Sequence, residues 1–288
     1  MKVSALLSVF SLLSLHVALM TLCACSRAPQ AHITESASAR EAVSDPIDLV
    51  DLKPWAETLR LVVQGEDVLY PALRSGEPAR ASLDQFLEAL KAPIDPSAPR
   101  AARLAYWVNA YNALTLRHVM RYPGLESVAV VPQGSPRYTF FKQKAHMVNG
   151  ALRSLDEIEH QILRPIFKDP RVHAALNCAS RSCPPLASTP YRAATIDAQL
   201  DTAARRFVND SARHQLAARP PELSKIFEWF SEDFRGTSPS SHEGVIAFIK
   251  RFADPSALRG SALNQESTTA PVRVVFKPYD WALNGPQP

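Results

Sequence analysis

Residues 154–186, SLDEIEHQILRPIFKDPRVHAALNCASRSCPPL, bring together a capped helix, a charged turn, a short apolar run and two cysteines. Ser154 and Glu157 have the spacing of a capping box, in which each side chain accepts a backbone N–H at the helix start. The helix that this box predicts gathers its apolar residues on one face: Leu155, Ile158, Ile162, Leu163 and Ile166. Glu159 falls within the same face, and because an unpaired buried carboxylate is costly, we expect it to have a partner.

A turn with two prolines and three charged residues follows the helix, between Pro165 and Arg171. Residues 173–176 then read as a short buried strand, which ends in the polar loop 177–183. Polar side chains that follow a strand into a loop are where folds often display chemistry. We therefore look for a functional site around this loop.

The polar residues of this stretch suggest a catalytic group. We expect His173 to act as a base, Glu159 or Asp169 to orient it, and Cys178 or Ser180 to act as the nucleophile. Such groups must lie within hydrogen-bond reach of one another.

Structural alternatives stay open for each of these residues. Glu159 could form an ion pair inside the core, and His173 could bind a backbone carbonyl. Cys178 and Cys183 could form a mutual disulfide or remain two buried thiols, against the reading of a reactive thiolate.

A second informative stretch is the predicted helix 101–120, AARLAYWVNAYNALTLRHVM, which is apolar on nearly all sides from 104 to 116. It should run through the middle of the domain. Because buried amides must be hydrogen-bonded, Asn109 and Asn112 should hold either a neighbouring backbone segment or a ligand. The candidate ligand-binding residues are Asn109, Tyr111, Asn112, His160, Arg164, Arg171 and Ser180.

The remaining pattern mixes helices with short strands. Helices are predicted over 48–64, 82–90 (with Ser82 and Gln85 as a capping box), 196–208 and 241–252. Strands are predicted over 128–131, 138–141, 145–148, 223–227 and 272–276, with a hairpin turn at Asn149-Gly150 and a linker over 253–270. Without a regular strand–helix alternation, the fold class is α+β, a mainly helical single domain with a small, mostly antiparallel sheet.

The N-terminal residues predict export. Residues 1–24 read as a signal peptide, and its end, LCAC, is similar to a lipobox with Cys25 as the lipidated residue. Ser26 resembles the residue of lipoproteins sorted to the outer membrane. We expect a flexible tether over 25–47, a single globular domain over 48–288, and a periplasm-facing protein of the bacterial cell envelope that is attached to the membrane through its lipid.

Composition narrows the function classes. The net charge of +4 and the lack of a basic tract argue against a nucleic-acid partner. No glycine-rich phosphate loop is present, and no histidine pair has the spacing of a zinc helix. His118, His146, His160, His173 and Glu159 could supply metal ligands, but their spacing does not favour a metal site, and no cofactor is expected.

Several motifs in matching order resemble one family. They are YWVNAYNALTL at 106–116, SLDEIEHQILR at 154–164 and DPRVHAALNCASRSCPPL at 169–186, with QLDTAARRFV, LSKIFEWFSEDF and PYDWALN further on. Together they resemble the family of domain of unknown function 547 (DUF547), here as an exported bacterial lipoprotein. The likeness covers most of 83–284, with core motifs over 83–255 and a C-terminal strand over 272–284. It implies a fold and no established reaction.

Two kinds of function remain open. One is a hydrolase-like or acyl-transferase-like pocket around His173, Glu159 and the loop 177–183, acting on a small molecule or another envelope ligand. The other is a non-catalytic binding or scaffold domain with a structural polar network. The discriminating question is whether Glu159, His173, Asn109 and Asn112 converge on an open cleft or on a sealed core.

Overall fold

The computed structural model describes residues 47–74, 76–131, 136–264 and 272–286. The predictions of a signal peptide, of a lipobox at Cys25 and of a tether fall almost entirely on residues 1–46, outside the described residues.

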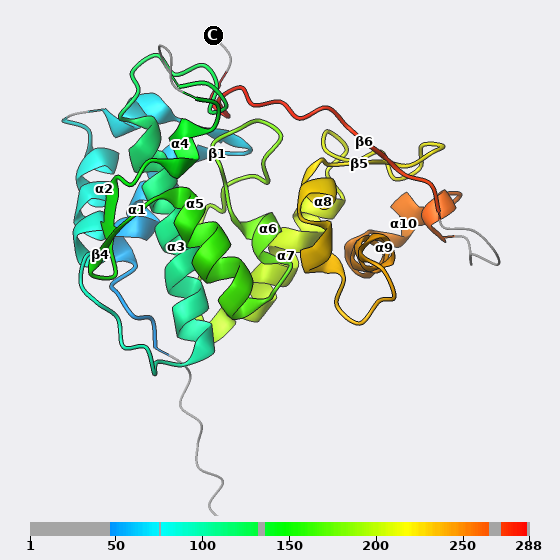
Figure 1. Ribbon diagram of the computed structural model, residues 1–288. Helices are drawn as coiled ribbons and strands as arrows, with labels where there is room; N and C mark the ends of the chain where they lie inside the picture. Colours follow the sequence, from blue (N-terminus) through cyan, green and yellow to red (C-terminus); the bar gives the residue numbers. More distant parts are fainter. Residues whose placement is uncertain (1–46, 75, 132–135, 265–271, 287–288) are drawn as a thin grey trace, which may run out of the picture. The chain divides into compact units, whose positions relative to one another are not determined.

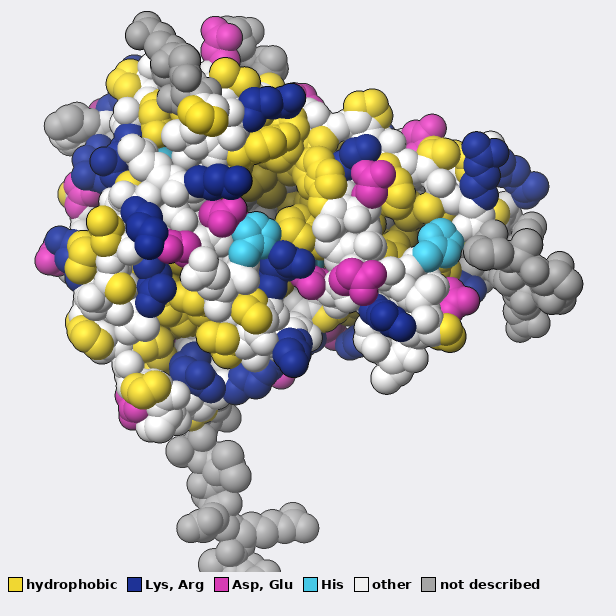
Figure 2. Space-filling view, viewed as in Figure 1, with side chains coloured by type: hydrophobic (Ala, Val, Ile, Leu, Met, Phe, Trp, Pro, Cys, Tyr) yellow, Lys and Arg dark blue, Asp and Glu magenta, His cyan; other side chains and the backbone are white. Residues whose placement is uncertain are grey.

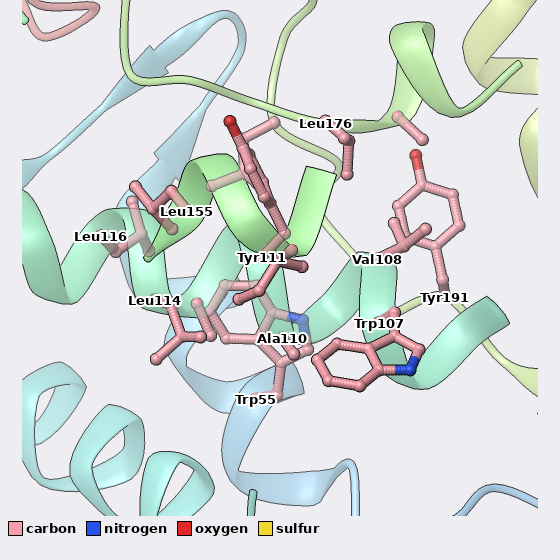
Figure 3. Packing of buried hydrophobic residues seen from close by; sticks show 14 of the residues in the cluster. Trp55, Trp107, Val108, Ala110, Tyr111, Leu114, Leu116, Leu155, Leu176 and Tyr191 are labelled. Carbon is pink, nitrogen blue, oxygen red and sulfur yellow. The ribbon is translucent and has the colours of Figure 1, made fainter. Parts of the chain in front are cut away.

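The central element is the helix α3 (Arg100–Val119), as the sequence predicts (Figure 1). Every residue from 104 to 116 is buried, because other elements pack against α3 on all sides. Figure 3 shows Trp107, Tyr111 and Leu114 of this helix packed among the side chains of Trp55 and Leu155. A helix that is apolar all round belongs in a core, which is where α3 lies.

Two helices, α1 (Lys53–Val62) and α2 (Pro78–Ala89), pack on each other beside α3. Trp55 of α1 stacks on Phe86 of α2, with ring centroids 5.6 Å apart. The predicted cap at Ser82 is wrong, because Pro78 starts α2 one turn earlier and Ser82 lies inside the helix. Between the helices lie β1 (Val63–Gln64), β2 (Asp67–Val68) and η1 (Tyr70–Leu73).

The predicted hairpin at Asn149-Gly150 is confirmed. Strands β3 (His146–Val148) and β4 (Ala151–Arg153) pair antiparallel around it, with both turn residues at positive φ (48° and 70°). Two other predicted strands are wrong. Residues 128–131 form a loop, and 138–141 overlap a short helix, α4 (Thr139–Lys142). The Pro136 carbonyl accepts a hydrogen bond from the Thr139 backbone N–H and starts that turn. The apolar run is therefore helical, with Phe140 as its buried residue.

The capping box at Ser154 and Glu157 is confirmed. The Ser154 hydroxyl accepts the Glu157 N–H at 3.1 Å, and the Glu157 carboxylate accepts the Ser154 N–H at 2.9 Å. The helix begins as α5 (Leu155–Glu157) and continues as a π-helix, η2 (Ile158–Phe167). Its wider turn shifts the periodicity, so Phe167 is buried where Ile166 was expected, and Ile166 is 54 % exposed.

The predicted strand 173–176 is a helical turn, α6 (Val172–Ala175). The Asp169 carboxylate accepts the Arg171 N–H at 3.1 Å, and the Asp169 and Pro170 carbonyls accept the N–H groups of Val172 and His173. This turn, followed by two alanines, favours a helix over a strand of the same apolar pattern.

The second half of the described chain forms a further apolar cluster around the helices α7 (Ile196–Val208) and α9 (Ser241–Phe252), both as predicted. The strand predicted over 223–227 is correct only at its start, because α8 begins at Ile226. The expected linker 253–270 contains short helices within its described part. The other elements are η3 (Ala193–Thr195), β5 (Glu222–Leu223), α8 (Ile226–Trp229), η4 (Ser231–Phe234), α10 (Pro255–Leu258), η5 (Ala262–Asn264) and β6 (Val275–Phe276).

A glycine in α9 sets the distance between α9 and η4. A Cβ on Gly244 would lie 2.3 Å from the Phe234 carbonyl oxygen, so only glycine allows this approach. The contact fixes η4, the short helix that carries Asp233.

The described strands make two antiparallel pairs, β1–β2 and β3–β4, and one parallel pair, β5–β6. Helices form most of the rest, so the prediction of a mainly helical α+β fold is confirmed. Within the described ranges, no helix has the length and apolar character needed to span a bilayer.

Candidate functional site

A cavity of about 240 Å³ opens where the π-helix, α6, the loop 177–183 and the C-terminal segment meet. Figure 2 shows a hollow bordered by hydrophobic side chains on one face of the molecule, with charged and histidine side chains along its lower edge. The lining side chains come from Tyr111, Tyr138, Phe141, Lys142, Asp156, Glu159, His160, His173, Leu176, Cys178, Cys183, Ile226, Trp229, Phe230, Tyr279 and Trp281. The three residues predicted as catalytic, Glu159, His173 and Cys178, therefore line one cavity.

One wall of the cavity is aromatic. Trp229 of α8 stacks on Trp281 with ring centroids 5.5 Å apart, and Tyr279 packs against both rings. Trp229 is 42 % exposed although it is a large apolar side chain. Exposed aromatic rings beside a polar floor are typical of ligand pockets.

His173 on α6 is held by a carboxylate other than the two that the sequence predicts for it. Its Nε2 lies 2.7 Å from Oδ2 of Asp233 on η4, and its Nδ1 lies 4.0 Å from Oε1 of Glu159. Burial lowers the pKa of His173, although the Asp233 carboxylate acts in the opposite direction. The ring is therefore neutral near pH 7, with Nε2–H donating to Asp233 and the lone pair on Nδ1 facing Glu159.

Arg164 of the π-helix completes this anchor. Its Nε and Nη2 donate to the two oxygens of Asp233 at 2.5 and 3.1 Å. Burial raises the pKa of Asp233, but the hydrogen bonds from His173 and Arg164 bring that pKa well below its ordinary value. Phe230 fills the space between them, with the His173 ring stacked 4.2 Å away and the Arg164 guanidinium 4.9 Å from its centroid. Arg164 also contacts Nδ1 of His160 at 2.7 Å, so His160 belongs to the same group.

Glu159 has the partner that the sequence led us to expect. The Tyr111 hydroxyl of α3 donates to its Oε2 at 3.3 Å. Burial raises the pKa of Glu159, even though His160 and Arg164 act against that rise. This carboxyl group is therefore a proton donor candidate at the cavity floor.

Cys178 lies among hydrogen-bonding groups. Its Sγ is 3.0 Å from the Ser180 hydroxyl and 3.4 Å from the Tyr279 hydroxyl, which are 3.0 Å from each other. Burial raises the pKa of the Cys178 thiol, but hydrogen bonds from Cys183, Ser180 and Tyr279 outweigh burial and lower that pKa to about 7. A large share of thiolate at neutral pH is what makes a cysteine nucleophilic.

Asn109 and Asn112 lie outside the cavity lining, and both hold backbone. Asn109 bonds the N–H and C=O of Tyr191 at 2.9 and 2.6 Å and accepts from Trp55 Nε1 at 3.1 Å. Asn112 donates to the Ala175 carbonyl at 3.0 Å and accepts the Asn177 N–H at 2.8 Å. Glu159 and His173 thus line the open cavity, whereas Asn109 and Asn112 form hydrogen bonds inside the core. Asn112 also fixes the backbone that leads into Cys178.

Arg171 and Asp169 form a separate ion-pair cluster. Arg171 binds Asp169, Asp197 and Asp201 at 2.7 to 2.8 Å, and neither Arg171 nor Asp169 lines the cavity. The residue that orients His173 is therefore Asp233, where Glu159 or Asp169 was expected.

Sequence reasoning missed Asp233 and Tyr279 as site residues. Asp233 and Tyr279 belong to the runs LSKIFEWFSEDF and PYDWALN, which contribute only to the family resemblance in the sequence. Nothing in the local spacing places Asp233 beside a histidine 60 residues earlier, and the aromatic residues around it were the available signal.

Cys178 and Cys183 are both free thiols in the structure. In the described ranges, no three His, Cys, Asp or Glu side chains are grouped so that they could hold a metal ion. The possible metal ligands His118 and His146 are buried against each other, with Nδ1 of His118 3.1 Å from Nε2 of His146.

The fold and the cavity define a mainly helical α+β domain with a thiol, an imidazole and a carboxyl group around one aromatic pocket. Residues 96–208 of the chain match the family model described as "Protein of unknown function, DUF547". The resemblance to this family is thereby confirmed over residues 96–208, which are similar to a domain that is described as being of unknown function. Asp233, Trp229 and Tyr279 lie beyond the matched residues. Neither a curated protein nor a solved structure matches the chain.

Proposed function

We propose that the cavity is the active site of a cysteine-dependent hydrolase or acyltransferase, with Cys178 as the nucleophile. The observation that carries this proposal is the hydrogen bonding of the Cys178 sulfur by Ser180 and Tyr279 in the cavity that also contains the anchored His173 ring. A hydrogen-bonded thiol, an imidazole and a carboxyl group with a raised pKa are components that covalent acyl transfer can use.

The roles follow from the protonation states. The Cys178 sulfur attacks the carbonyl carbon of an ester or thioester and forms an enzyme thioester. Burial raises the pKa of Glu159, which lies at the cavity floor, and in this proposal its carboxyl group gives a proton to the departing alcohol or thiol. The acceptor, water or another nucleophile, then loses its proton to Nδ1 of His173 as it releases the acyl group. Asp233 keeps that nitrogen free by binding Nε2–H.

The aromatic wall favours an apolar acyl group. Trp229, Tyr279 and Trp281 offer ring faces beside the thiol, and an apolar chain placed there loses its contact with water. The cavity volume of about 240 Å³ suits a small acyl group more than a polymer segment.

The test combines thiol alkylation with ester hydrolysis. The rate of Cys178 alkylation by iodoacetamide should rise with pH around an inflection near 7, and Cys178→Ala should abolish hydrolysis of p-nitrophenyl esters. Trp229→Ala should lower kcat/KM for a butyrate ester more than for acetate. His173→Ala should remove activity while the Tm changes by only a few degrees.

Two observations support the alternative of a non-catalytic binding domain. Asn109 and Asn112 bind backbone groups, and His173 is hydrogen-bonded to Asp233. If Cys178→Ala hydrolyses esters as fast as the unaltered chain, the catalytic proposal is wrong. Retention of an apolar fluorescent probe by both proteins would then favour a binding site in the same cavity.

We also propose that the chain is an exported lipoprotein attached to the cell envelope through Cys25. The support is the LCAC motif after an apolar N-terminal run, with Ser26 next to the cysteine. Cys25→Ser should release the protein from the membrane fraction into the soluble fraction. A Cys25→Ser protein that stays with the membranes would overturn this reading.

A further inference from the structure

The loop 177–183 brings two thiols together, and the proposed hydrolysis uses only one of them. The backbone N–H of Cys178 donates to Sγ of Cys183 at 2.8 Å, and each thiol shifts the pKa of the other. Cys183 is 4 % exposed and its Sγ also contacts the Leu176 carbonyl oxygen at 3.4 Å. Both cysteines line the cavity, so a small molecule that enters it can reach Cys178.

Hydrogen bonds within the loop 177–183 hold the two cysteines in this arrangement. The Asn177 side chain accepts the Ala179 N–H at 3.1 Å and donates to the Pro184 carbonyl at 2.8 Å. Ala179 adopts a positive φ of 66°, which turns the chain between the two cysteines.

Arg213 fixes the far side of the same loop. Its Nε donates to the Cys183 carbonyl at 2.9 Å and its Nη2 to the Arg181 carbonyl at 3.0 Å. Arg213 is buried and its charge is balanced by Asp210 and Glu66. By binding both carbonyls, the charged Arg213 side chain holds the backbone on either side of Ser182 in place beside Cys178.

We propose that Cys178 and Cys183 form a dithiol–disulfide redox site whose oxidant is hydrogen peroxide. Cys178 is the attacking cysteine, because hydroxyl groups stabilise its thiolate and the cavity exposes it. Cys183 is the resolving cysteine, because its sulfur accepts the Cys178 backbone N–H and it is more deeply buried than Cys178.

The reaction is a two-electron oxidation in two steps. The Cys178 thiolate attacks one peroxide oxygen, the O–O bond breaks, and Cys178 becomes a sulfenic acid while hydroxide leaves and is protonated by the solvent. The Cys183 sulfur then attacks the Cys178 sulfur, the S–O bond breaks, and hydroxide leaves with the Cys183 proton as water. In sum, two thiols and one hydrogen peroxide give one disulfide and two waters.

The charges of the pair favour this order. Burial raises the pKa of Cys183 well above its ordinary value, and the neighbouring Cys178 raises it further. Cys183 therefore stays protonated and unreactive while Cys178 is a thiolate. Once Cys178 is a neutral sulfenic acid, the second of these effects is gone and Cys183 loses its proton more easily.

Formation of this disulfide does not depend on the proposed hydrolysis. A second effect does rest on it, because the disulfide occupies the sulfur that would attack the ester. Peroxide should then switch the hydrolysis off, and dithiothreitol should restore it.

Tryptic cleavage sites in the sequence allow the disulfide between Cys178 and Cys183 to be detected by mass spectrometry. Trypsin cleaves after Arg171, Arg181 and Arg192, so Cys178 and Cys183 fall on different peptides, 172–181 and 182–192. The full chain is treated with hydrogen peroxide, blocked with N-ethylmaleimide, digested and analysed by mass spectrometry. The expected result is a cross-linked pair of these two peptides that disappears on reduction with dithiothreitol.

The matched control is Cys183→Ser, which nearly keeps the size of the side chain and replaces the thiol at the resolving position by a hydroxyl. In this variant dimedone should label the peptide 172–181 as a sulfenic acid, and no cross-link should form. Cys183→Ala gives the same expectation and replaces the serine variant if that variant fails to fold by circular dichroism.

Two outcomes overturn the proposal. One is a native chain in which peroxide leaves both peptides as thiols, or carries the peptide 172–181 to sulfinic acid without a cross-link. The other is a cross-link from either peptide to Cys23 or Cys25. Since the peptide assay reads the bond and the ester assay reads hydrolysis, failure of one proposal leaves the result for the other intact.

Discussion

Asp233 determines what the His173 ring can do. Its carboxylate binds Nε2 of the ring and leaves Nδ1 free, and it also forms an ion pair with Arg164. A neutral imidazole buried without this partner could present either nitrogen to the cavity. One carboxylate therefore fixes both the direction of the ring and its tautomer.

Replacement of Asp233 by asparagine should lower the pKa of His173. The Asp233 carboxylate raises that pKa against the effect of burial, and asparagine keeps the shape but not the charge. The variant should also lose about 1–3 kcal/mol of unfolding free energy, because Arg164 loses a charged partner. NMR titration of the histidine ring protons and urea unfolding would measure both effects.

Glu232→Gln is the matched control for this prediction. Glu232 precedes Asp233 in η4, but its carboxylate is largely exposed and bonds Ser241. The control should change neither the His173 titration nor stability by more than a few tenths of a kcal/mol. An Asp233→Asn protein whose His173 titrates as before would show that the carboxylate does not control the ring.

The residues of the site could be predicted from the sequence only in part. Glu159, His173 and Cys178 belong to one stretch, and their polar character inside an apolar pattern is visible without a structure. Asp233 and Tyr279 come from distant segments. The contact of Asp233 with His173 and that of Tyr279 with Cys178 depend on how α9, η4 and the chain end pack. Long-range contacts of this kind leave no trace in local spacing.

At the scale of elements, two side chains of α3 connect this helix to segments far along the chain. Asn112 holds the backbone on both sides of Leu176, and Asn109 holds Tyr191. The two amides lie three residues apart, yet only Asn112 supports the loop that contains the thiols. Comparison of the two therefore separates support of the site from support of the core.

Asn112→Ala should destabilise the protein and change the reactivity of Cys178. It leaves the Ala175 carbonyl and the Asn177 N–H without their partner, and each buried unsatisfied group costs about 1–3 kcal/mol. Asn109→Ala should cost a similar amount but leave the alkylation rate of Cys178 within about twofold. Equal changes in the alkylation rate for both variants would mean that general loosening of the core, and not the Asn112 clamp, controls the thiol.

Helices were predicted better than strands, for a physical reason. The helices α3, α7 and α9 are long, and the spacing of their apolar residues is helical or apolar throughout, so their identity follows from local sequence. The short apolar runs 138–141 and 173–176 fit a strand as well as a buried helical turn. The preceding Pro136 and Asp169 decided the outcome through hydrogen bonds that the apolar pattern does not contain.

At the scale of the whole molecule, the fold buries several histidines in the neutral state. Burial lowers the pKa of His118 to about 4, of His146 to about 3 and of His214 to about 3. In the unfolded chain, each of these rings titrates near pH 6.5. Below that pH the unfolded state binds more protons than the folded state, so stability falls as the pH falls.

This difference predicts how stability changes between pH 7 and pH 5, and the His214→Asn variant isolates one contribution. The Nδ1 atom of His214 accepts the Ser224 N–H at 3.1 Å, and an asparagine oxygen can take over that bond without titrating. Between pH 6 and pH 5, the unfolding free energy of the variant should therefore fall less steeply than that of the unaltered chain, by about 1 kcal/mol per pH unit. Urea unfolding across this range measures the two slopes, and from pH 7.5 to 8.5 the slopes should be equal, because His214 is neutral in both states there. Parallel curves between pH 6 and pH 5 would mean that His214 takes up its proton without unfolding, and the acid sensitivity would then have to come from the contact between His118 and His146.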